Sequence, residues 1–201
     1  MKGLKAITIE DDEKFLRQVS KPINFLDDNI HEYITLLDDY FKESDKALAM
    51  AAVQLGIPKR LIYIKNTNLE LIERKQQDQE LEEDKLYNEK RILINPVILS
   101  KEGLTDYWEA CASCLDNVGH VKRPYKIKIE YYDIYNKRIE ETFEGFEATV
   151  LSHEMDHLDG LLHMDIADEV LVMTDEERKE FRKTHGYNII SKKGNYDELI
   201  K

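Results

Sequence analysis

Cysteine is scarce in this chain, and its scarcity excludes one class of protein. The 201 residues include only two cysteines, Cys111 and Cys114. Two thiols this close together are too few for a disulfide framework, and a bridge between them would close too short a loop to stabilise the chain usefully. We therefore expect free thiols or metal ligands at these positions.

Long apolar runs and an excess of basic residues are also missing. No stretch approaches the ~18 apolar residues that a membrane-spanning helix needs, and residues 1–15 lack the apolar core of a signal peptide. The formal net charge of -12 argues against general nucleic-acid binding, which uses clustered Lys and Arg. These absences predict a cytoplasmic protein with no membrane partner.

The apolar residues that are present make up 42% of the chain, enough for one domain with a sizeable core over residues 1–201. In residues 27–43 they recur at steps of three and four, which predicts an N-terminal amphipathic helix. Residues 61–64 and 91–99 have the β-branched composition of strands, and Pro96 predicts a bulge or an edge position in the second. Residues 125–144 alternate about a turn at Asn136-Lys137, which predicts a hairpin.

Two segments lack a core-forming pattern. Residues 66–90 are dominated by charged side chains with only scattered apolar ones, so we expect an exposed surface insertion there. The last residues, from about 190 to 201, are polar enough to fray as a tail.

The richest local pattern is an H-E-x-x-H motif at residues 153–157. In a helix, His153 and His157 stand one turn apart on one face, where both imidazoles can bind one metal ion and Glu154 can reach a water on that ion. The surrounding residues 146–159 have a partly buried apolar face, and Gly160 is placed to end the helix in a left-handed turn. The spacing therefore predicts a catalytic metal site on a helix.

A catalytic metal usually has three protein ligands and one open position, so one ligand remains to be found. Downstream, residues 153–163 match the H-E-x-x-H-x-x-G-x-x-H pattern of metzincin proteases, which would recruit His163. Upstream, Cys111 offers a thiolate. The local patterns leave both ligands open.

Three separated segments resemble the peptide deformylase family, which carries G-x-G-x-A-A-x-Q, E-G-C-x-S and H-E-x-D-H-L-x-G in that order. Here residues 47–54 read A-L-A-M-A-A-V-Q, residues 109–113 read E-A-C-A-S, and residues 153–160 read H-E-M-D-H-L-D-G. Residues 16–23 are also similar to the family's opening, so the resemblance covers roughly residues 11–166. The insertion between the first two motifs resembles the longer, Gram-positive-type branch.

The resemblance implies an α+β fold in which antiparallel strands wrap a central metal-binding helix. It also implies a hydrolase that removes the formyl group from the N-terminal formyl-methionine of newly made bacterial proteins. Cys111, His153 and His157 would bind one divalent metal ion, with Fe²⁺ as the native ion and Zn²⁺ or Ni²⁺ as alternatives.

The same resemblance implies roles for residues that do not bind the metal. Glu154 would take a proton from the attacking water and pass it to the leaving amine. Gln54 and the backbone N–H of Ala112 would hold the oxyanion that develops on the formyl oxygen. We interpret three charged residues as structural partners of the ligands: Glu109, Arg123 and Asp156. Three apolar residues are candidates for the methionine side-chain pocket, with core packing as the alternative: Leu48, Phe146 and Val150.

Alanine departs from the family's pattern at four positions. It replaces glycine at Ala47, Ala49 and Ala110, and at Ala112 it replaces the bulky residue that usually follows the metal cysteine. Glycine in such a motif serves either to allow a positive φ or to let a substrate approach closely. We expect the second reason to apply, which predicts a working enzyme with a reshaped substrate groove. The alternatives are a metal-binding homologue that acts on another amide or peptide, and a metzincin-like metalloprotease that uses His163.

Four basic residues gather in the predicted helix at residues 175–183: Arg178, Lys179, Arg182 and Lys183. Such a cluster could contact ribosomal RNA weakly, near emerging chains. The alternative is pairing within the helix with Glu176, Glu177 and Glu180, which the three- and four-residue spacing allows.

Overall fold

One long strand, β3 (Arg91–Ala110), organises the sheet of this computed structural model, which describes residues 4–44, 47–65 and 90–201. Successive stretches of β3 pair antiparallel with four other strands: β2 (Leu61–Ile64), β5 (Lys126–Tyr132), β8 (Asn188–Asn195) and β4 (Asn117–Arg123). Three more strands extend the sheet: β1 (Ala49–Ala51) beside β2, β6 (Arg138–Glu144) beside β5, and β7 (Glu169–Val172) beside β4.

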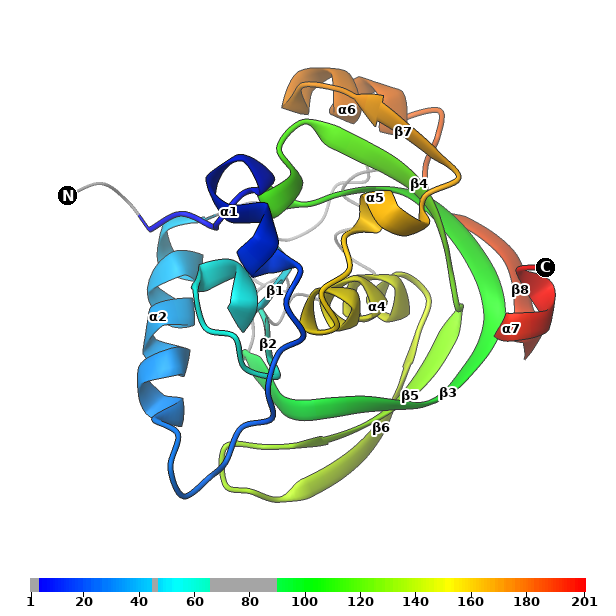
Figure 1. Ribbon diagram of the computed structural model, residues 1–201. Helices are drawn as coiled ribbons and strands as arrows, with labels where there is room; N and C mark the ends of the chain where they lie inside the picture. The colour runs from blue at the N-terminus through cyan, green and yellow to red at the C-terminus, as the bar shows by residue number, and fades with distance from the viewer. Residues whose placement is uncertain (1–3, 45–46, 66–89) are drawn as a thin grey trace, which may run out of the picture.

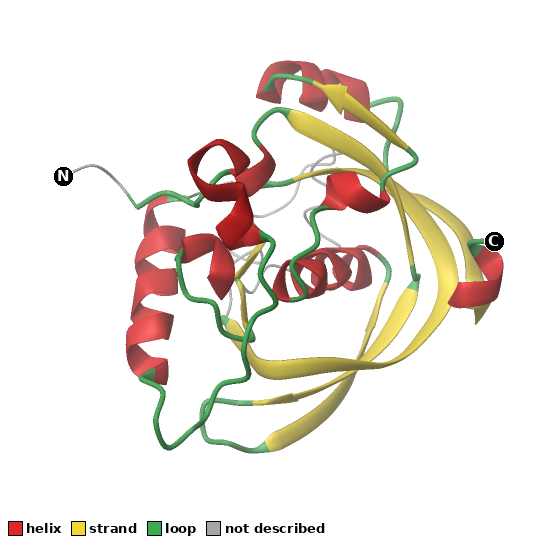
Figure 2. Ribbon diagram, viewed as in Figure 1, coloured by secondary structure: helices red, strands yellow, loops and turns green. Residues whose placement is uncertain are grey.

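The strands curve around one helix, α4 (Phe146–Leu158), which lies in the middle of the molecule (Figure 1). Figure 2 shows the same relationship by secondary structure, with strands on several sides of this helix. Nine of its residues are buried, and Ala148, Leu151, Met155 and Leu158 belong to the main apolar core. The predicted α+β fold with a central motif helix is confirmed.

The end of α4 is sharply defined. Gly160 has a φ of +76°, in the left-handed region that favours glycine. A Cβ at this position would lie 2.3 Å from the carbonyl oxygen of Arg17, so the N-terminal segment packs directly against the turn. The prediction that Gly160 ends the helix in a left-handed turn is confirmed.

The N-terminal segment carries α1 (Ile9–Leu16) and α2 (Ile30–Glu43). The sequence predicts the second helix from residue 27, but it begins at Ile30 because Asn29 caps it by accepting a hydrogen bond from the backbone N–H of Glu32. Its apolar face packs on the sheet, where the rings of Phe41 and Tyr63 stack with centroids 4.5 Å apart.

A bulge interrupts β3 where the sequence predicts one. The pairing with β5 shifts register between Ile94 and Val97, and Asn95 has a φ of 52°. The side chain of Asn95 accepts from the backbone N–H of Ile23 at 2.7 Å and donates to its carbonyl at 2.9 Å. Beyond the bulge the strand continues to Ala110, well past the predicted end at residue 99.

The predicted hairpin is also present. β5 and β6 pair from Lys126↔Glu144 to Tyr132↔Arg138, and Asn136 in the connecting turn has a φ of 60°. Earlier in the chain, 3₁₀ turns at Ala52–Leu55 and Ala112–Cys114 follow β1 and β3. Between α4 and β8 the chain forms two helices: α5 (His163–Ile166) and α6 (Asp175–Arg182).

The prediction of a frayed tail over residues 190–201 is wrong. β8 pairs with β3 from Glu102↔Asn195 to Asp106↔Asn188, and α7 (Tyr196–Leu199) follows it. The hydroxyl of Tyr196 donates to the carbonyl of Lys122 at 2.9 Å. Polar composition misled the prediction, because backbone hydrogen bonds to an open strand edge hold this segment without a buried apolar face.

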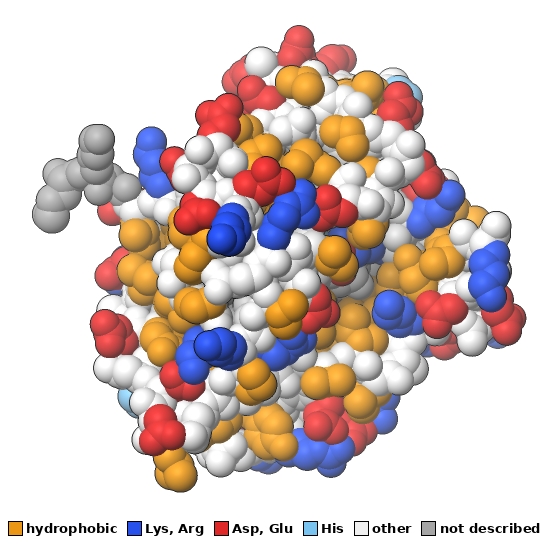
Figure 3. All heavy atoms as spheres, in the orientation of Figure 1, with side chains coloured by type: hydrophobic (Ala, Val, Ile, Leu, Met, Phe, Trp, Pro, Cys, Tyr) orange, Lys and Arg blue, Asp and Glu red, His pale blue; other side chains and the backbone are white. Residues whose placement is uncertain are grey.

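The predicted insertion over residues 66–90 lies outside the described residues, apart from Lys90. In the described part of the chain, no helix combines the length and the apolar character needed to cross a membrane. On the face drawn in Figure 3, Lys and Arg side chains are interspersed with Asp and Glu. This face therefore lacks a continuous basic surface.

Candidate metal centre

The two motif histidines of α4 meet the end of β3. Nε2 of His153 lies 3.2 Å from Nε2 of His157, which lies 3.2 Å from Sγ of Cys111. Cys111 directly follows the last residue of β3, so strand and helix together fix the three side chains. Their ligand atoms all lie within 4.8 Å of one another.

This donor set fits a divalent metal ion. Tetrahedral Zn²⁺ with bonds of about 2.0–2.3 Å would hold its nitrogen and sulfur ligands about 3.3–3.6 Å apart, close to the separations here. A thiolate and two imidazoles suit both Fe²⁺ and Zn²⁺. Three protein ligands would leave one tetrahedral position open, as catalytic sites do and closed structural sites do not.

A buried ion pair orients one ligand. Oε2 of Glu109 lies 2.8 Å from Nδ1 of His153, so the Nδ1 hydrogen goes to the carboxylate and the lone pair of Nε2 faces Cys111 and His157. Arg123 donates to both carboxylate oxygens of Glu109, at 2.7 and 2.9 Å, and to Asp156 at 2.5 Å. These contacts match the structural role predicted for the three charged residues.

Charge balance is essential here because Glu109 and Arg123 are each 4% exposed. Burial alone would raise the pKa of Glu109, but the Arg123 guanidinium holds that pKa well below its usual range. Both groups therefore remain charged, and removing either one would leave the other buried without its counter-charge.

Glu154 directly follows His153 on α4, and its carboxylate reaches the neighbouring strand β1. Its Oε2 accepts a hydrogen bond from the backbone N–H of Ala51 at 2.7 Å. Burial raises the pKa of Glu154 to about 7. A carboxylate with a pKa in that range can both take and return a proton near neutral pH.

Gln54 connects the first motif to the second. Its Oε1 accepts from the same Ala51 N–H at 3.1 Å, which turns Nε2 toward Cys111 Sγ, at 3.3 Å, and toward Ser113 Oγ, at 3.0 Å. Gln54 is 2% exposed and Ser113 fully buried. The amide is thus a fixed donor beside the ligands, and its partner Ser113 is the serine of the second motif, to which the motif alone assigns no role.

His163 is close to the centre but belongs to a different contact. Its ring stacks on that of His153 with centroids 5.7 Å apart, while its Nε2 lies 3.2 Å from the carbonyl oxygen of Asn117. In the described residues, the ligand group contains Cys111 and not His163. The geometry therefore favours the upstream ligand over the metzincin pattern.

The four alanines need no unusual backbone conformation. Across residues 4–44, 47–65 and 90–201, positive φ at non-glycine positions is confined to Asn95, Leu115 and Asn136. Alanine at residues 47, 49, 110 and 112 is therefore unstrained, and its methyl groups affect only clearance. Cys114 is fully buried and outside the ligand group, as expected for a small core residue.

An apolar cluster adjoins the metal ligands. Phe146 and Tyr107 form its buried centre, with Leu48, Val150 and Tyr187 packed against it. The three residues predicted for the methionine pocket thus lie together. Sequence patterns give no signal for Tyr187, which comes from the segment between α6 and β8.

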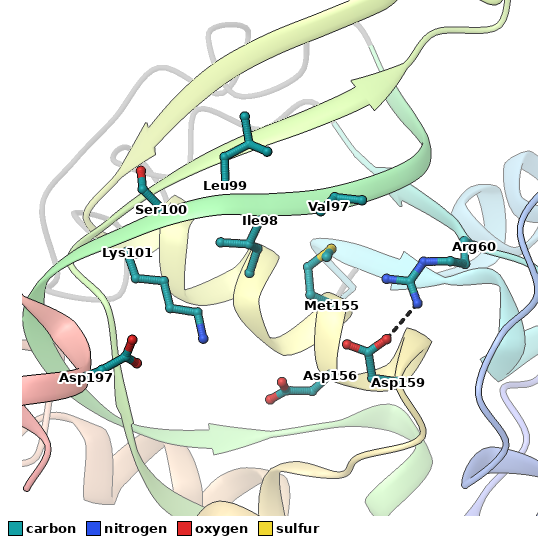
Figure 4. Close-up of a pocket in the computed structure, with 10 residues that line it drawn as sticks. All are labelled: Arg60, Val97, Ile98, Leu99, Ser100, Lys101, Met155, Asp156, Asp159 and Asp197. Carbon is teal, nitrogen blue, oxygen red and sulfur yellow. Dashed lines mark hydrogen bonds and ion pairs between the residues drawn. The ribbon is translucent and has the colours of Figure 1, made fainter.

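A separate hollow of about 430 Å³ is lined by Met155 and Asp156 of α4 and by Asp159 just after this helix (Figure 4). Arg60 and Asp159 pair across part of it at 2.6 Å, and Val97–Lys101 of β3 form one wall. The ligand group lies elsewhere, so this hollow is distinct from the metal centre.

Comparison with known proteins gives one consistent family. The polypeptide deformylase family model matches residues 5–171. Peptide deformylase 2 of Clostridium acetobutylicum is 33% identical over 84% of this chain and 99% of its own length. The peptide deformylase of Pelagibacter ubique is 36% identical over 81% of this chain and 86% of its own.

Solved structures agree. A probable peptide deformylase from Synechococcus phage S-SSM7 is 30% identical, with a TM-score of 0.64 over 81% of this chain and 98% of the other. The peptide deformylase of Thermotoga maritima is 25% identical, with a TM-score of 0.66 over 84% of this chain and 100% of the other. The similarity spans nearly the full length of both solved structures and more than four fifths of this chain.

Proposed function

Because the chain belongs to the peptide deformylase family, metal-dependent hydrolases that remove the formyl group from N-terminal formyl-methionine, we propose which of its residues carry out that reaction. The observation that carries the proposal is the meeting of Cys111, His153 and His157 at the junction of β3 and α4. Glu154 and Gln54 reach the same place from their shared contact with the backbone N–H of Ala51.

The three ligand residues hold one divalent ion, which we propose to be Fe²⁺, with Zn²⁺ and Ni²⁺ as alternatives. When bound there, such an ion would lower the pKa of water and polarise a carbonyl oxygen. Glu109 fixes the ring of His153 for this purpose, because its carboxylate accepts the Nδ1 hydrogen at 2.8 Å.

Glu154 serves as the proton shuttle. Its carboxylate accepts the proton that the attacking water loses, and then passes that proton to the nitrogen of the leaving methionine. The bond between formyl carbon and this nitrogen breaks, which releases formate and a free N-terminal amine. A cation at the neighbouring ligands would lower the pKa of Glu154 below its present value of about 7 and keep the carboxylate ready to accept.

Gln54 and the backbone N–H of Ala112 stabilise the charge that develops on the formyl oxygen. Gln54 is suited to this role because the Ala51 N–H holds its Oε1 and leaves Nε2 as a fixed donor. A preorganised donor of this kind contributes about 10²–10³-fold to turnover.

The substrates are the formyl-methionyl N-termini of new polypeptides, which makes a cytoplasmic location part of the proposal. The proposal also includes a weak contact with ribosomal RNA, which competes with ion pairs inside the protein. Arg178 pairs with Asp175 at 2.5 Å, Lys183 pairs with Glu180 at 2.8 Å, and Arg182 turns inward. These contacts favour pairing within the protein, and co-sedimentation with ribosomes that weakens as salt rises would favour the RNA contact.

The decisive experiment is formate release from formyl-Met-Ala-Ser by protein prepared and loaded with Fe²⁺ without oxygen. We expect turnover by the wild type and none by Cys111→Ala. Turnover of an unformylated amide or peptide with no formate release would instead identify a homologue with another substrate.

A further inference from the structure

Two elements, α4 and β3, connect the apolar cluster to the metal ligands. Phe146 and Val150 lie about two turns and one turn before His153 on the same face of α4. Tyr107 lies on the same face of β3 as Glu109, because side chains alternate along a strand. A side chain attached to a peptide bound at the ligands would therefore enter this cluster.

Tyr187 packs against this cluster from the segment between α6 and β8, which carries none of the three ligands. Its ring centroid lies 5.4 Å from that of Phe146 and 6.2 Å from that of Tyr107, which in turn lie 5.2 Å apart. All three contacts are edge-to-face, the arrangement that packs aromatic rings most favourably. The three rings therefore contact one another pairwise and form a packed triangle at this end of the cluster.

Neighbouring contacts fix the position of Tyr187. The next residue, Asn188, begins β8 and pairs with Asp106 of β3. From α6, the guanidinium of Arg182 lies 4.7 Å from the centroid of Tyr107 and donates to the carbonyl of Trp108 at 2.6 Å. The pairing of β8 with β3 thus fixes the backbone next to Tyr187. The Tyr187 ring also contacts Tyr107, which takes part in the cation–π contact with Arg182.

The family match ends at residue 171, so Tyr187 and Arg182 belong to a part of the chain beyond it. Resemblance to the family therefore gives no reason to expect either residue at the substrate. The pairing of β8 with β3 and the contacts of Arg182 with Tyr107 and Trp108 bring this segment back to the site.

We propose that Tyr187 forms the closed end of the pocket that takes the first side chain of the formyl peptide and so sets the length of side chain accepted. This inference rests on the proposed function and adds a specificity-determining residue to it. An aromatic end wall leaves space for a slender side chain such as methionine and excludes a ring. A change of one methylene in such a pocket alters selectivity about 10–200-fold.

The test compares kcat/KM for formyl-Phe-Ala-Ser with that for formyl-Met-Ala-Ser. We expect Tyr187→Ala to raise the Phe-to-Met ratio at least tenfold, and Tyr187→Phe, which keeps the ring, to leave the ratio unchanged. Ile189→Ala is the matched control, because Ile189 is 42% exposed and lies on β8 two residues further along. Should Tyr187→Ala fail to fold by circular dichroism, Tyr187→Leu replaces it with the same expectation.

Two results would overturn the inference: an unchanged ratio in a folded Tyr187→Ala or Tyr187→Leu variant, or an equal change in Ile189→Ala. A wild type that releases no formate would contradict the proposed function instead. In that case NMR titration with Met-Ala-Ser and Phe-Ala-Ser tests the role of Tyr187 in the pocket, because it measures affinity and needs no turnover. Relative affinity for Phe-Ala-Ser should rise in Tyr187→Ala, and equal relative affinities in the two proteins would reject the end wall.

Discussion

Oε2 of Glu109 and Nδ1 of His153 lie 2.8 Å apart, so a buried carboxylate determines which nitrogen of the histidine faces the other ligands. The two residues come from different elements, β3 and α4, and Arg123 holds the carboxylate from a third, β4. The metal centre thus depends on residues that hold its ligands in position without binding the ion themselves.

Replacing Glu109 should weaken metal binding. We expect Glu109→Gln to lower metal affinity about 10–100-fold, because the neutral amide no longer fixes the ring or increases its basicity. Competition with a chelator measures the affinity. Glu102→Gln on the same strand is the control, since the Glu102 side chain is 44% exposed and its carboxylate lies 3.9 Å from Lys126. Equal affinities for both variants would assign Glu109 a purely structural role.

The third ligand can be identified by metal content. Cys111→Ala should lose the metal, whereas His163→Ala should keep one ion per chain, because Nε2 of His163 faces the carbonyl of Asn117. Cys114→Ala should also keep it, since Cys114 is buried outside the ligand group. Elemental analysis of the three proteins is the measurement, and retention of metal by Cys111→Ala with loss by His163→Ala would reverse the assignment.

Glu154→Gln should separate metal binding from turnover. Glutamine can still accept the Ala51 N–H but cannot carry a proton, so we expect full metal content and a kcat lowered by about 10²–10⁴-fold. Glu147→Gln, near the start of the same helix, provides the control. Near-normal formate release by Glu154→Gln would remove Glu154 from the mechanism.

The Arg17–Asp165 pair should make stability depend on pH. The Arg17 guanidinium, bonded to Asp165 at 2.8 and 3.1 Å, lowers the pKa of that carboxyl. A lowered folded-state pKa gives stability that is complete above the unfolded pKa near 4 and is lost as the pH falls through the folded value.

Asp165→Asn should therefore destabilise the protein most at pH 7 and progressively less below about pH 4. Because the Arg17 side chain is 37% exposed, solvent screening limits the effect at pH 7 to about 0.5–1 kcal/mol. Urea unfolding at pH 7 and pH 3 measures both values. If the two proteins differed in free energy of unfolding by the same amount at both pH values, packing or hydrogen bonding and not charge would account for the effect of Asp165→Asn.

The motif alanines should tune preference without abolishing activity. Since Ala49 and Ala112 have ordinary φ angles, Ala49→Gly with Ala112→Leu should shift kcat/KM by roughly tenfold among formyl-Met-X peptides that differ in X. An inactive iron-loaded wild type, restored by Ala49→Gly alone, would show that the alanines had ended catalysis.

Local periodicity explains what the sequence could predict. A helix repeats every 3.6 residues, so the spacing of His153 and His157 already placed both rings on one face, with Glu154 beside them. The hairpin about Asn136 and the bulge at Pro96 are equally local, because turn conformation and the missing proline N–H act within a few residues.

By itself, the sequence therefore determined the motif helix, the hairpin and the two histidine ligands. The choice between Cys111 and His163 needed the tertiary structure or a family resemblance, because both lie at plausible distances along the chain. Only the tertiary structure turned His163 toward Asn117, paired β8 with β3 and brought Tyr187 against Phe146. Such contacts join residues far apart in the chain through backbone pairing and packing, and no repeat within a short segment encodes them.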